Sequence, residues 1–359
     1  MIQVTKAFLP PKEDYISILD AVWESGWITN RGMLVQELEN KLADYLGVSN
    51  IIIMNNGTVP IQIAIQLLGK DAEIITTPFS YVATTSAISW QNCIPVFVDI
   101  HPEYLTIDET KIEDKITGRT KAILATHVFG NPCNIEEIAK IANTHNLMVI
   151  YDAAHAFGVK YKGQSIFNYG DISTCSFHAT KLFHTGEGGA LITSSQSLYH
   201  QCYYRHNFGH NGFTDFFGVG INGKISELQA AMGLAILPYI HEILSKRKTL
   251  VENYERNLMH LPQLQFMKLR DLTAWNYSYF PVIFPDEETL LNTMNALNKL
   301  NVFPRRYFYP SLNKLNYVQY QSMPISEGIS KCILSLPLAH DLSYEDVNQV
   351  CKIIRKVFE

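Results

Sequence analysis

A lysine in a glycine-rich turn is the first feature of this sequence that could do chemistry. The stretch from Cys175 to Leu191 reads CSFHATKLFHTGEGGAL and places Lys181 just after a strand-like run. His178 and Thr180 lie in the same polar turn, and a glycine cluster precedes a second apolar run. A lysine amine in such a bend could form a Schiff base with a carbonyl compound. The stretch alone also fits a surface lysine in a tight hairpin.

A candidate anion-binding turn lies earlier in the chain, where Asn56, Gly57 and Thr58 follow the apolar run from Ile51 to Met54. These residues open a predicted helix, so free backbone N–H groups and the helix dipole could hold a phosphate there. The hydroxyl of Thr58 would add a donor, although an ordinary helix N-cap explains the same pattern. The turn is not a Walker loop, because the GxxxxGK[ST] pattern is missing.

An aromatic residue and an acid follow two more predicted strands. Tyr81 lies in the segment PFSY, where its ring could stack on a planar ligand, although aromatic residues at such turns more often belong to the core. Asp152, in the segment DAAH, follows an apolar run that begins at Leu147. A carboxylate in this position is costly to bury without a partner. It therefore either caps the next turn or holds a proton on a ligand nitrogen.

An anion cradle, an aromatic platform, an acid and a lysine together match the needs of pyridoxal phosphate (PLP). This cofactor requires an amine for its aldehyde, a carboxylate for its ring nitrogen and donors for its phosphate. A Schiff-base enzyme without this coenzyme would not need the phosphate cradle. A dinucleotide enzyme would require GxGxxG after the first strand, and that motif is absent.

The elements that position these residues alternate between short apolar runs and helical segments. Strands are predicted at 51–54, 73–77, 95–100, 121–127, 147–152, 171–177 and 190–194, with helices at 12–25, 35–46, 59–68 and 135–146 and one that ends at 91. Repeated strand–helix units predict an α/β fold, in which helices cover both faces of a mostly parallel sheet. Ligands of such sheets bind beyond the carboxyl ends of the strands, where the polar clusters lie.

The chain is predicted to divide into two domains near residue 260. Residues 1–260 form the large domain, with an N-terminal arm over 1–35 and long helices after 225 that kink at Pro238. Residues 261–359 form a smaller α+β domain, with a strand from Tyr277 to Phe284 and helices at 287–300 and 344–358.

Composition narrows the class of protein. Hydrophobic residues make up 47% and charged residues 18% of the 359 positions, which is ordinary for a globular protein. The net charge of −5 argues against nucleic-acid and membrane-surface partners. The six cysteines have no metal-ligand spacing, so we expect reduced thiols and no metal. No signal-peptide pattern and no apolar run near about 18 residues is visible, so we expect a cytoplasmic protein.

The sequence resembles the sugar-nucleotide aminotransferase family known as the DegT/StrS group over nearly its whole length. The matching motifs are WITNRGMLVQELE, NNGTVPIQIAI, PFSYVATTSA, FGNP, DAAHAFGVKYKG, SFHATKLFHTGEGGA, GINGKISELQAAMG and LSLPLAHDLS. The resemblance implies the aspartate-aminotransferase fold (PLP fold type I), in which the large domain holds a mostly parallel seven-stranded sheet. It also implies a homodimer with shared active sites.

The same resemblance assigns roles to particular residues. Lys181 would bind the cofactor aldehyde and shuttle protons, Asp152 would pair with the pyridine nitrogen, and Tyr81 would stack on the ring. The other implied cofactor contacts are Gly57, Thr58 and Ser176 at the phosphate, His155 in the pocket wall, and Asn222 of the partner subunit. Two positions depart from the family pattern, since Asn56 stands where Ser is frequent and Lys224 stands where Arg is common.

The implied reaction moves an amino group from L-glutamate to a nucleotide-linked keto sugar with ping-pong kinetics. The motifs are most similar to members that convert dTDP-4-keto-6-deoxy-D-glucose to dTDP-4-amino-4,6-dideoxy-D-glucose, for surface polysaccharide such as O-antigen. The alternatives are a 3-keto sugar, a UDP- or GDP-linked sugar, or a non-catalytic PLP-binding regulatory protein. Candidate substrate contacts are Trp27, Thr29, Arg205, His210, Lys224, Arg305, Arg306 and Tyr307. Each charged residue among them also fits a solvated surface position.

Overall fold

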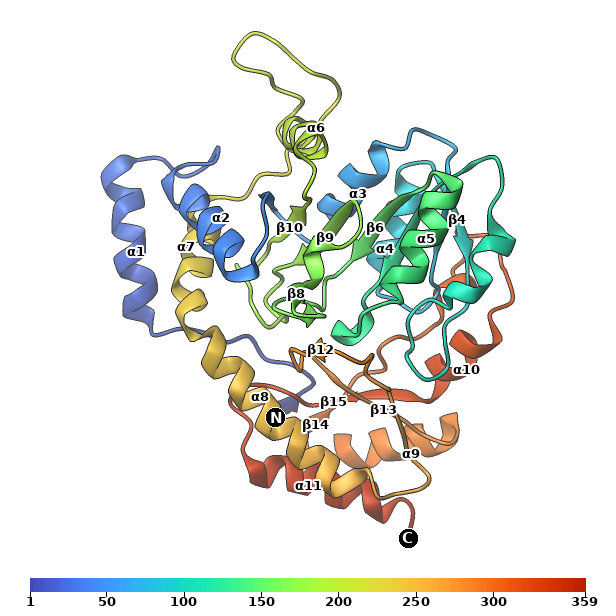
Figure 1. Ribbon diagram of the computed structural model, residues 1–359. Helices are drawn as coiled ribbons and strands as arrows, with labels where there is room; N and C mark the ends of the chain where they lie inside the picture. Colours follow the sequence, from blue (N-terminus) through green and yellow to red (C-terminus); the bar gives the residue numbers. More distant parts are fainter.

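A seven-stranded sheet forms the centre of the larger part of the computed structural model, which describes residues 1–359 (Figure 1). The strand order is β2-β10-β9-β6-β5-β3-β4, and only β10 runs antiparallel to its neighbours. The bounds are β2 Ile51–Met54, β3 Glu73–Thr76, β4 Ile94–Phe97, β5 Thr120–Thr126, β6 Met148–Asp152, β9 Ile172–Ser176 and β10 Gly189–Ile192. The predicted mostly parallel seven-stranded sheet is confirmed, and the strand ends differ from the predicted ones by a few residues.

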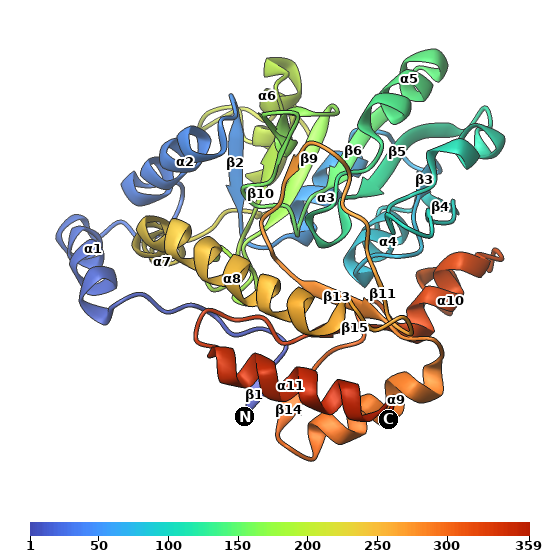
Figure 2. The same cartoon turned by 60° about the horizontal axis from the view of Figure 1, so that its bottom comes forward.

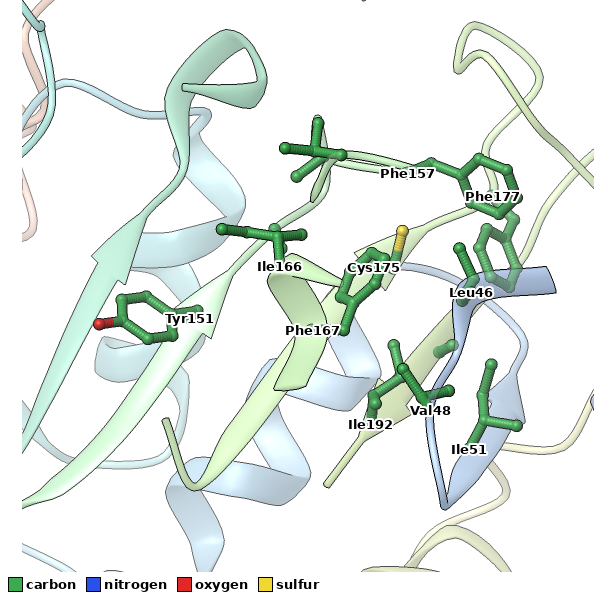
Figure 3. Close-up of a cluster of buried hydrophobic side chains, with 14 of the residues drawn as sticks. Leu46, Val48, Ile51, Tyr151, Phe157, Ile166, Phe167, Cys175, Phe177 and Ile192 are labelled. Atoms are coloured by element: carbon green, nitrogen blue, oxygen red, sulfur yellow. The ribbon is translucent and has the colours of Figure 1, made fainter. Parts of the chain in front are cut away.

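Alternation along each strand sends its side chains into two separate cores. Ile51 and Ile53 of β2 lie in the first core, whereas Ile52 and Met54 lie in the second. The same division holds along β5, β6 and β10, because successive side chains of a strand point to opposite faces of the sheet. Figure 3 shows part of the first core, where Phe157 and Phe177 pack near Cys175. This double burial explains why the strands are almost uniformly apolar.

Helices cover both faces of the sheet, as predicted. The first core is closed by α2 (Met33–Leu46), α5 (Ile135–His145) and α7 (Glu227–Ile236), and the second by α3 (Thr58–Gln66), α4 (Val82–Trp90) and α6 (Gln196–His206). Outside them, α1 (Lys12–Ser25) packs against α7. The short 3-10 helices are Glu109–Lys111, Glu113–Lys115, Val128–Gly130, Ile166–Asn168, Leu237–Tyr239 and Leu312–Lys314. A small side sheet consists of β7 (Lys160–Tyr161), β8 (Gln164–Ser165) and β12 (Thr273–Ala274).

The long helical segment after residue 225 breaks at Pro238, as predicted. A 3-10 turn, Leu237–Tyr239, separates α7 from α8 (Ile240–Leu258), because proline cannot donate the backbone hydrogen bond that an α-helix needs. We expected no segment apolar enough to cross a membrane, yet Glu227–Leu258 as a whole meets that criterion by length and composition, with 44% of its most apolar window buried. Its apolar residues pack into the first core and, further along, into the core of the smaller part of the chain, which is typical of a core helix.

The smaller part of the chain is built on a three-stranded antiparallel sheet. Its strands are β11 (Gln265–Phe266), β13 (Phe280–Ile283) and β15 (Ile333–Leu336), and its helices are α9 (Glu287–Asn298), α10 (Pro324–Cys332) and α11 (Tyr344–Lys356). The predicted strand from Tyr277 is too long. Tyr277 has a φ of 53°, in the left-handed region, so extended pairing begins only at Phe280.

Segments on both sides of residue 260 pack against each other, and the domain boundary at that residue stays a prediction. Near the N-terminus, β1 (Ile2–Gln3) pairs with β14 (Val302–Phe303), so the start of the predicted arm lies beside the smaller part (Figure 2). The second half of α8, including Leu250 and Tyr254, packs into the core that contains α11. Continuous packing of this kind fixes the smaller part against the large sheet.

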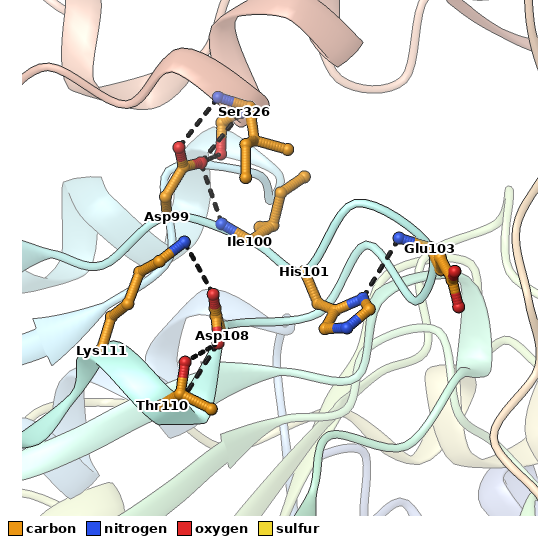
Figure 4. Close-up of polar contacts among 9 residues, drawn as sticks. Asp99, Ile100, His101, Glu103, Asp108, Thr110, Lys111 and Ser326 are labelled. Atoms are coloured by element: carbon orange, nitrogen blue, oxygen red, sulfur yellow. Dashed lines mark hydrogen bonds and ion pairs between the residues drawn. The ribbon is translucent and has the colours of Figure 1, made fainter.

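A buried carboxylate makes a further link between the two parts (Figure 4). Asp99, which follows β4, accepts backbone hydrogen bonds from Ile325 at 2.9 Å and Ser326 at 2.8 Å, and a third from the Ser326 hydroxyl at 2.6 Å. These amides belong to the first turn of α10, where the negative charge of a carboxylate also interacts favourably with the helix dipole. The contact holds the smaller part near the carboxyl edge of the large sheet.

Candidate active site

A cavity of about 220 Å³ lies at the carboxyl ends of the sheet strands and is closed on one side by the smaller part of the chain. The structure brings nine of the predicted site residues to its wall: Gly57, Thr58, Tyr81, Asp152, His155, Ser176, Lys181, Arg305 and Tyr307. The wall does not include Trp27, Thr29, Arg205, His210, Asn222 or Lys224. The sequence clusters that follow separate strands therefore converge on one site.

Lys181 projects into this cavity from the turn after β9. Its backbone N–H donates to the His178 carbonyl at 2.8 Å, which closes the turn, and its Nζ lies 3.4 Å from the hydroxyl of Tyr279. Burial alone lowers the pKa of the Lys181 ammonium, but Tyr279, Tyr307 and Asp152 outweigh burial and raise that pKa. A half-buried lysine held in this way is positioned for covalent chemistry and is not a free surface charge.

Asp152 occupies the last position of β6 and is almost fully buried. Its Oδ2 accepts a hydrogen bond from the Thr84 hydroxyl at 2.6 Å, and its Oδ1 accepts one from the Ala154 amide at 3.1 Å. Burial raises the pKa of this carboxyl, and the two bonds together with Lys181 offset only part of that effect. A carboxylate has room for more than two donors, so Asp152 can still accept from a cationic group in the cavity.

The predicted phosphate cradle is only partly free. The Oδ1 of Asn56 accepts from the backbone amides of Thr58 at 2.8 Å and Val59 at 2.9 Å, so the side chain caps α3 itself. These two amides are therefore used in a helix cap, which was the alternative to phosphate binding in the sequence analysis. The hydroxyls of Thr58 and Ser176 remain at the cavity wall. Gly57 lies so close to Ser176 that an added Cβ would be 2.7 Å from the serine Cβ, which keeps this turn narrow.

Aromatic rings form the wall of the cavity beyond Asp152. His155 stacks against Phe308, with ring centroids 5.7 Å apart, and packs against Tyr279 at 4.7 Å. The Nδ1 of His155 accepts from the Phe129 amide at 3.1 Å, and burial lowers the pKa of the imidazole well below its ordinary value. The ring is therefore neutral with its proton on Nε2. Tyr81 lies at the mouth, with 57% of its surface exposed and free to cover a ligand.

Two adjacent arginines of the smaller part differ in position, since Arg305 faces the cavity and Arg306 does not. Arg305 lies at the rim, where its Nη1 donates to the Tyr307 hydroxyl at 3.1 Å. Arg306 instead donates to Glu287 at 2.6 Å and stacks over Tyr309, with its guanidinium carbon 3.5 Å from the ring centroid. We predicted Arg306 as a substrate contact, but its pairing and burial indicate a structural role.

The remaining predicted substrate residues lie on other surfaces of this chain. Asn222, Lys224 and His210 belong to the loop of residues 207–224 between α6 and α7, and Arg205 is the next-to-last residue of α6. Lys224 donates to Asn207 at 2.7 Å. Trp27 lines a separate shallow hollow beside α2, and Thr29 is exposed in the same connection. Within a single chain these six residues do not join the cavity.

Several wall residues were given no role in the site from the sequence, although some of them lie in the polar turns named above. They are Ser80, Thr126, His178, Thr180, Glu187, Tyr279 and Phe308 at the cavity, with Thr84 behind them. One signal was present, because Ser80 and Thr84 are four residues apart at a strand-to-helix turn and so share a face. Nothing in the sequence marks Tyr279 or Phe308, since the smaller part reaches the cavity only through the tertiary fold.

Pyridoxal phosphate fits the residues that line this cavity. Lys181 supplies an amine, and the buried Asp152 lacks a cationic partner in direct contact, which a protonated ring nitrogen would provide. The hydroxyls of Thr58 and Ser176 provide donors for a phosphate beside the N-terminus of α3. The chain contains no cluster of three or more His, Cys, Asp or Glu residues placed to hold a metal ion.

Comparison with known proteins agrees with this chemistry. The chain matches the DegT/DnrJ/EryC1/StrS aminotransferase family over residues 11–355. It is 39% identical to a dTDP-4-amino-4,6-dideoxy-D-glucose transaminase of Shigella dysenteriae, with 99% of each chain covered, and 37% identical to an Escherichia coli protein of the same name, with 98% of each covered.

Two solved structures share the fold. DesI, determined in the presence of its TDP-sugar product, is 30% identical with a TM-score of 0.93, covering 99% of this chain and 92% of that one. NtdA of Bacillus subtilis, with bound pyridoxamine phosphate, is 28% identical with a TM-score of 0.88, covering 96% and 81%. The protein is therefore a member of the DegT/DnrJ/EryC1/StrS aminotransferase family.

Proposed function

We propose that this protein is a PLP-dependent transaminase that uses L-glutamate to convert dTDP-4-keto-6-deoxy-D-glucose to dTDP-4-amino-4,6-dideoxy-D-glucose. The observation that carries the proposal is the presence of Lys181 and Asp152 on one cavity wall, in a chain of this aminotransferase family. The relatives at 39% and 37% identity, which are named for this product, support the choice of sugar.

The chemistry requires a proton carrier and a fixed negative charge. When bound, PLP acts as an electron sink for the carbon that gains or loses the amino group. With PLP bound, Lys181 as a neutral amine would move a proton at that carbon, and such positioned catalysis is worth about 10²–10⁴-fold. Tyr279 fixes the Lys181 amine through their 3.4 Å contact. Asp152 keeps the ring nitrogen protonated, since a buried carboxylate strongly favours a cation beside it.

The cofactor phosphate is assigned to the remaining free donors of the cradle. Ser176 and Thr58 offer hydroxyls, and the Asn56 side chain must turn away before a phosphate can reach the amides that it caps. With the cofactor bound, Tyr81 at the mouth would cover its ring, and His155 would line the buried wall. The neutral state of His155 avoids placing a second cation beside Lys181.

The nucleotide-sugar is assigned to the rim of the cavity. Arg305 is exposed there and carries a charge suited to a pyrophosphate or carboxylate, and Tyr307 orients it. Trp27, Thr29, Arg205, His210 and Lys224 stay candidate contacts that a single chain does not bring to the cavity. We also propose a cytoplasmic location, and a surface polysaccharide such as O-antigen would consume the product.

We also propose a homodimer in which the loop of residues 207–224 reaches the partner's cavity and brings Asn222 to it. The loop stands away from the rest of the chain (Figure 1), and its Phe213, Phe216 and Phe217 are exposed, Phe213 completely. Exposed aromatic residues grouped in this way usually mark a protein interface. The molar mass in solution should be twice the chain mass of 40.8 kDa. A mass equal to one chain at micromolar concentration would contradict the shared site.

The sugar assignment is tested by a panel of nucleotide-linked keto sugars. Purified protein with PLP and glutamate is incubated with 3-keto and 4-keto 6-deoxy sugars linked to dTDP, UDP or GDP, and products are resolved by NMR. The expected result is a new amine at C4 of the dTDP sugar, with 2-oxoglutarate formed in equal amount. Amination only at C3, or only of a GDP or UDP sugar, would overturn the sugar assignment. Cofactor binding without any product would favour a regulatory protein.

A further inference from the structure

A line of three buried hydroxyl groups leads to Asp152 from the neighbouring strand ends. The Thr126 hydroxyl donates to Ser80 at 3.1 Å, the hydroxyls of Ser80 and Thr84 are 2.8 Å apart, and Thr84 donates to Asp152 at 2.6 Å. Thr126 and Asp152 are paired in register on β5 and β6, and Thr84 lies in the first turn of α4. We call Thr126, Ser80 and Thr84 the hydroxyl chain.

The carboxylate fixes the direction of every bond in the hydroxyl chain. An ionised Asp152 can only accept, so Thr84 must donate to it. The Thr84 oxygen then accepts from Ser80, and the Ser80 oxygen accepts from Thr126, which agrees with the geometry of that contact. All four side chains are at most 4% exposed, so bulk water has little access to these bonds. Bonds aligned in one direction polarise one another and strengthen the last one.

We propose that Thr84, supported by Ser80 and Thr126, is the positioning residue that keeps Asp152 ionised and directed at the cofactor nitrogen. The proposal rests on the proposed function for its catalytic consequence, but the hydrogen bonds exist in the chain itself. Apart from the Ala154 amide and the hydroxyl chain, no protein group donates a hydrogen bond to the Asp152 carboxylate. The charge that must hold the ring nitrogen thus depends on one backbone amide and one side-chain hydroxyl, that of Thr84.

The surroundings of Asp152 contain few other groups that titrate. Lys181 acts on it from the turn after β9, Cys175 lies on the neighbouring strand β9 with its side chain in the first core, and His155 and Tyr279 line the same cavity. The backbone of His127, at the end of β5, donates to the Asp152 carbonyl at 3.0 Å. Burial raises the pKa of the thiol of Cys175 to about 12, so it stays neutral. Lys181 is the one cation whose charge acts on the carboxylate.

The neighbouring residue offers a matched control. Thr85 is also completely buried in α4, but its hydroxyl has no hydrogen-bond partner. Thr84→Val and Thr85→Val each replace a buried hydroxyl by a methyl of nearly the same shape, and only the first breaks the bond to Asp152. Thr84→Ser keeps the hydroxyl, and Ser80→Ala removes the second link while leaving Thr84 in place.

The first measurement is thermal unfolding of the cofactor-free protein between about pH 5 and pH 8. Because burial raises the folded-state pKa of Asp152, its carboxyl stabilises the fold at low pH, and this stability is lost as pH rises through the folded pKa. The Thr84 bond limits that loss. The Tm of Thr84→Val should therefore fall below the wild-type Tm by more at neutral pH than at acidic pH. Thr84→Ser should show little of this pH dependence, and Thr85→Val none.

The second measurement is steady-state turnover of the PLP-loaded enzyme. Thr84→Val should lower kcat by at least about tenfold, because a bond to a charged group is lost, and should leave the KM for the sugar unchanged. Ser80→Ala should cause a smaller loss in the same direction. Equal Tm deficits at both pH values, or equal behaviour of Thr84→Val and Thr85→Val, would overturn the proposal. If the wild type neither binds PLP nor turns over, the proposed function fails, while the unfolding measurement still decides the role of the hydroxyl chain.

Discussion

Replacing Lys181 by methionine is expected to reduce transamination by at least about 10²–10⁴-fold, the range typical of one positioned acid–base group. Methionine fills nearly the same volume but has no amine to bind the cofactor aldehyde or to carry a proton. The Lys181 amine contacts Tyr279, and Lys181 is the one lysine among the residues that line the cavity. Turnover of the keto sugar with glutamate measures the effect.

Lys70 provides a control, because its replacement removes a lysine that lies outside the site. It is exposed in the turn that follows α3 and does not line the cavity. Lys70→Met should keep wild-type turnover within a factor of about two, since isolated surface substitutions rarely change stability by more than about 0.5 kcal/mol. Full activity of Lys181→Met would refute the role assigned to this residue. Equal losses of turnover in Lys181→Met and Lys70→Met would show that the loss comes from general damage to the protein.

Replacing Asp152 by asparagine is the second change with a large expected effect. Asparagine keeps the shape but removes the charge that holds a proton on the ring nitrogen. Loss of one partner of a buried charge pair costs about 3–5 kcal/mol, so kcat should fall roughly 10²–10⁴-fold. In the cofactor-free protein the charge of Asp152 does not stabilise the fold, because burial disfavours the carboxylate and raises its pKa. The Tm of cofactor-free Asp152→Asn should therefore not fall at neutral pH.

Asp108 is a suitable comparison for this second variant. It is also buried, but Lys111 and Thr110 outweigh the effect of burial and lower the pKa of its carboxyl. Its ionisation therefore stabilises the fold above the unfolded pKa, and this stability is lost as pH falls. Asp108→Asn should lower the Tm at neutral pH while turnover stays intact. A large Tm loss in Asp152→Asn with unchanged kcat would contradict the catalytic assignment.

The sequence contained enough information to predict the sheet, the helices that cover it and the residues at the strand ends. Uniformly apolar runs such as Ile51–Met54 require burial on both faces, and that requirement alone favours a parallel sheet with helices on each side. The carboxyl ends of parallel strands then meet at one edge. Lys181, Asp152 and Tyr81 could therefore be grouped by their positions along the chain, because each lies at or just after the end of a different strand.

Contacts between distant segments could not be predicted in the same way. Asn56 was placed in an anion-binding turn, but only the folded geometry shows that its side chain caps the amides of α3. Arg305 and Arg306 are adjacent in sequence, and whether each one reaches the cavity depends on Glu287 and Tyr309. A pattern along one chain specifies which face of a strand is buried. It does not specify which side chain of a second domain completes the site.

The central claim, that Lys181 holds the cofactor in this cavity, has one most direct test. The purified protein is incubated with PLP, the bond between amine and aldehyde is fixed by borohydride reduction, and the digested chain is mapped by mass spectrometry. The structure predicts that the cofactor mass is found on the peptide that contains Lys181, and that excess glutamate added before reduction removes it. Labelling of another lysine, or of none, would contradict the account.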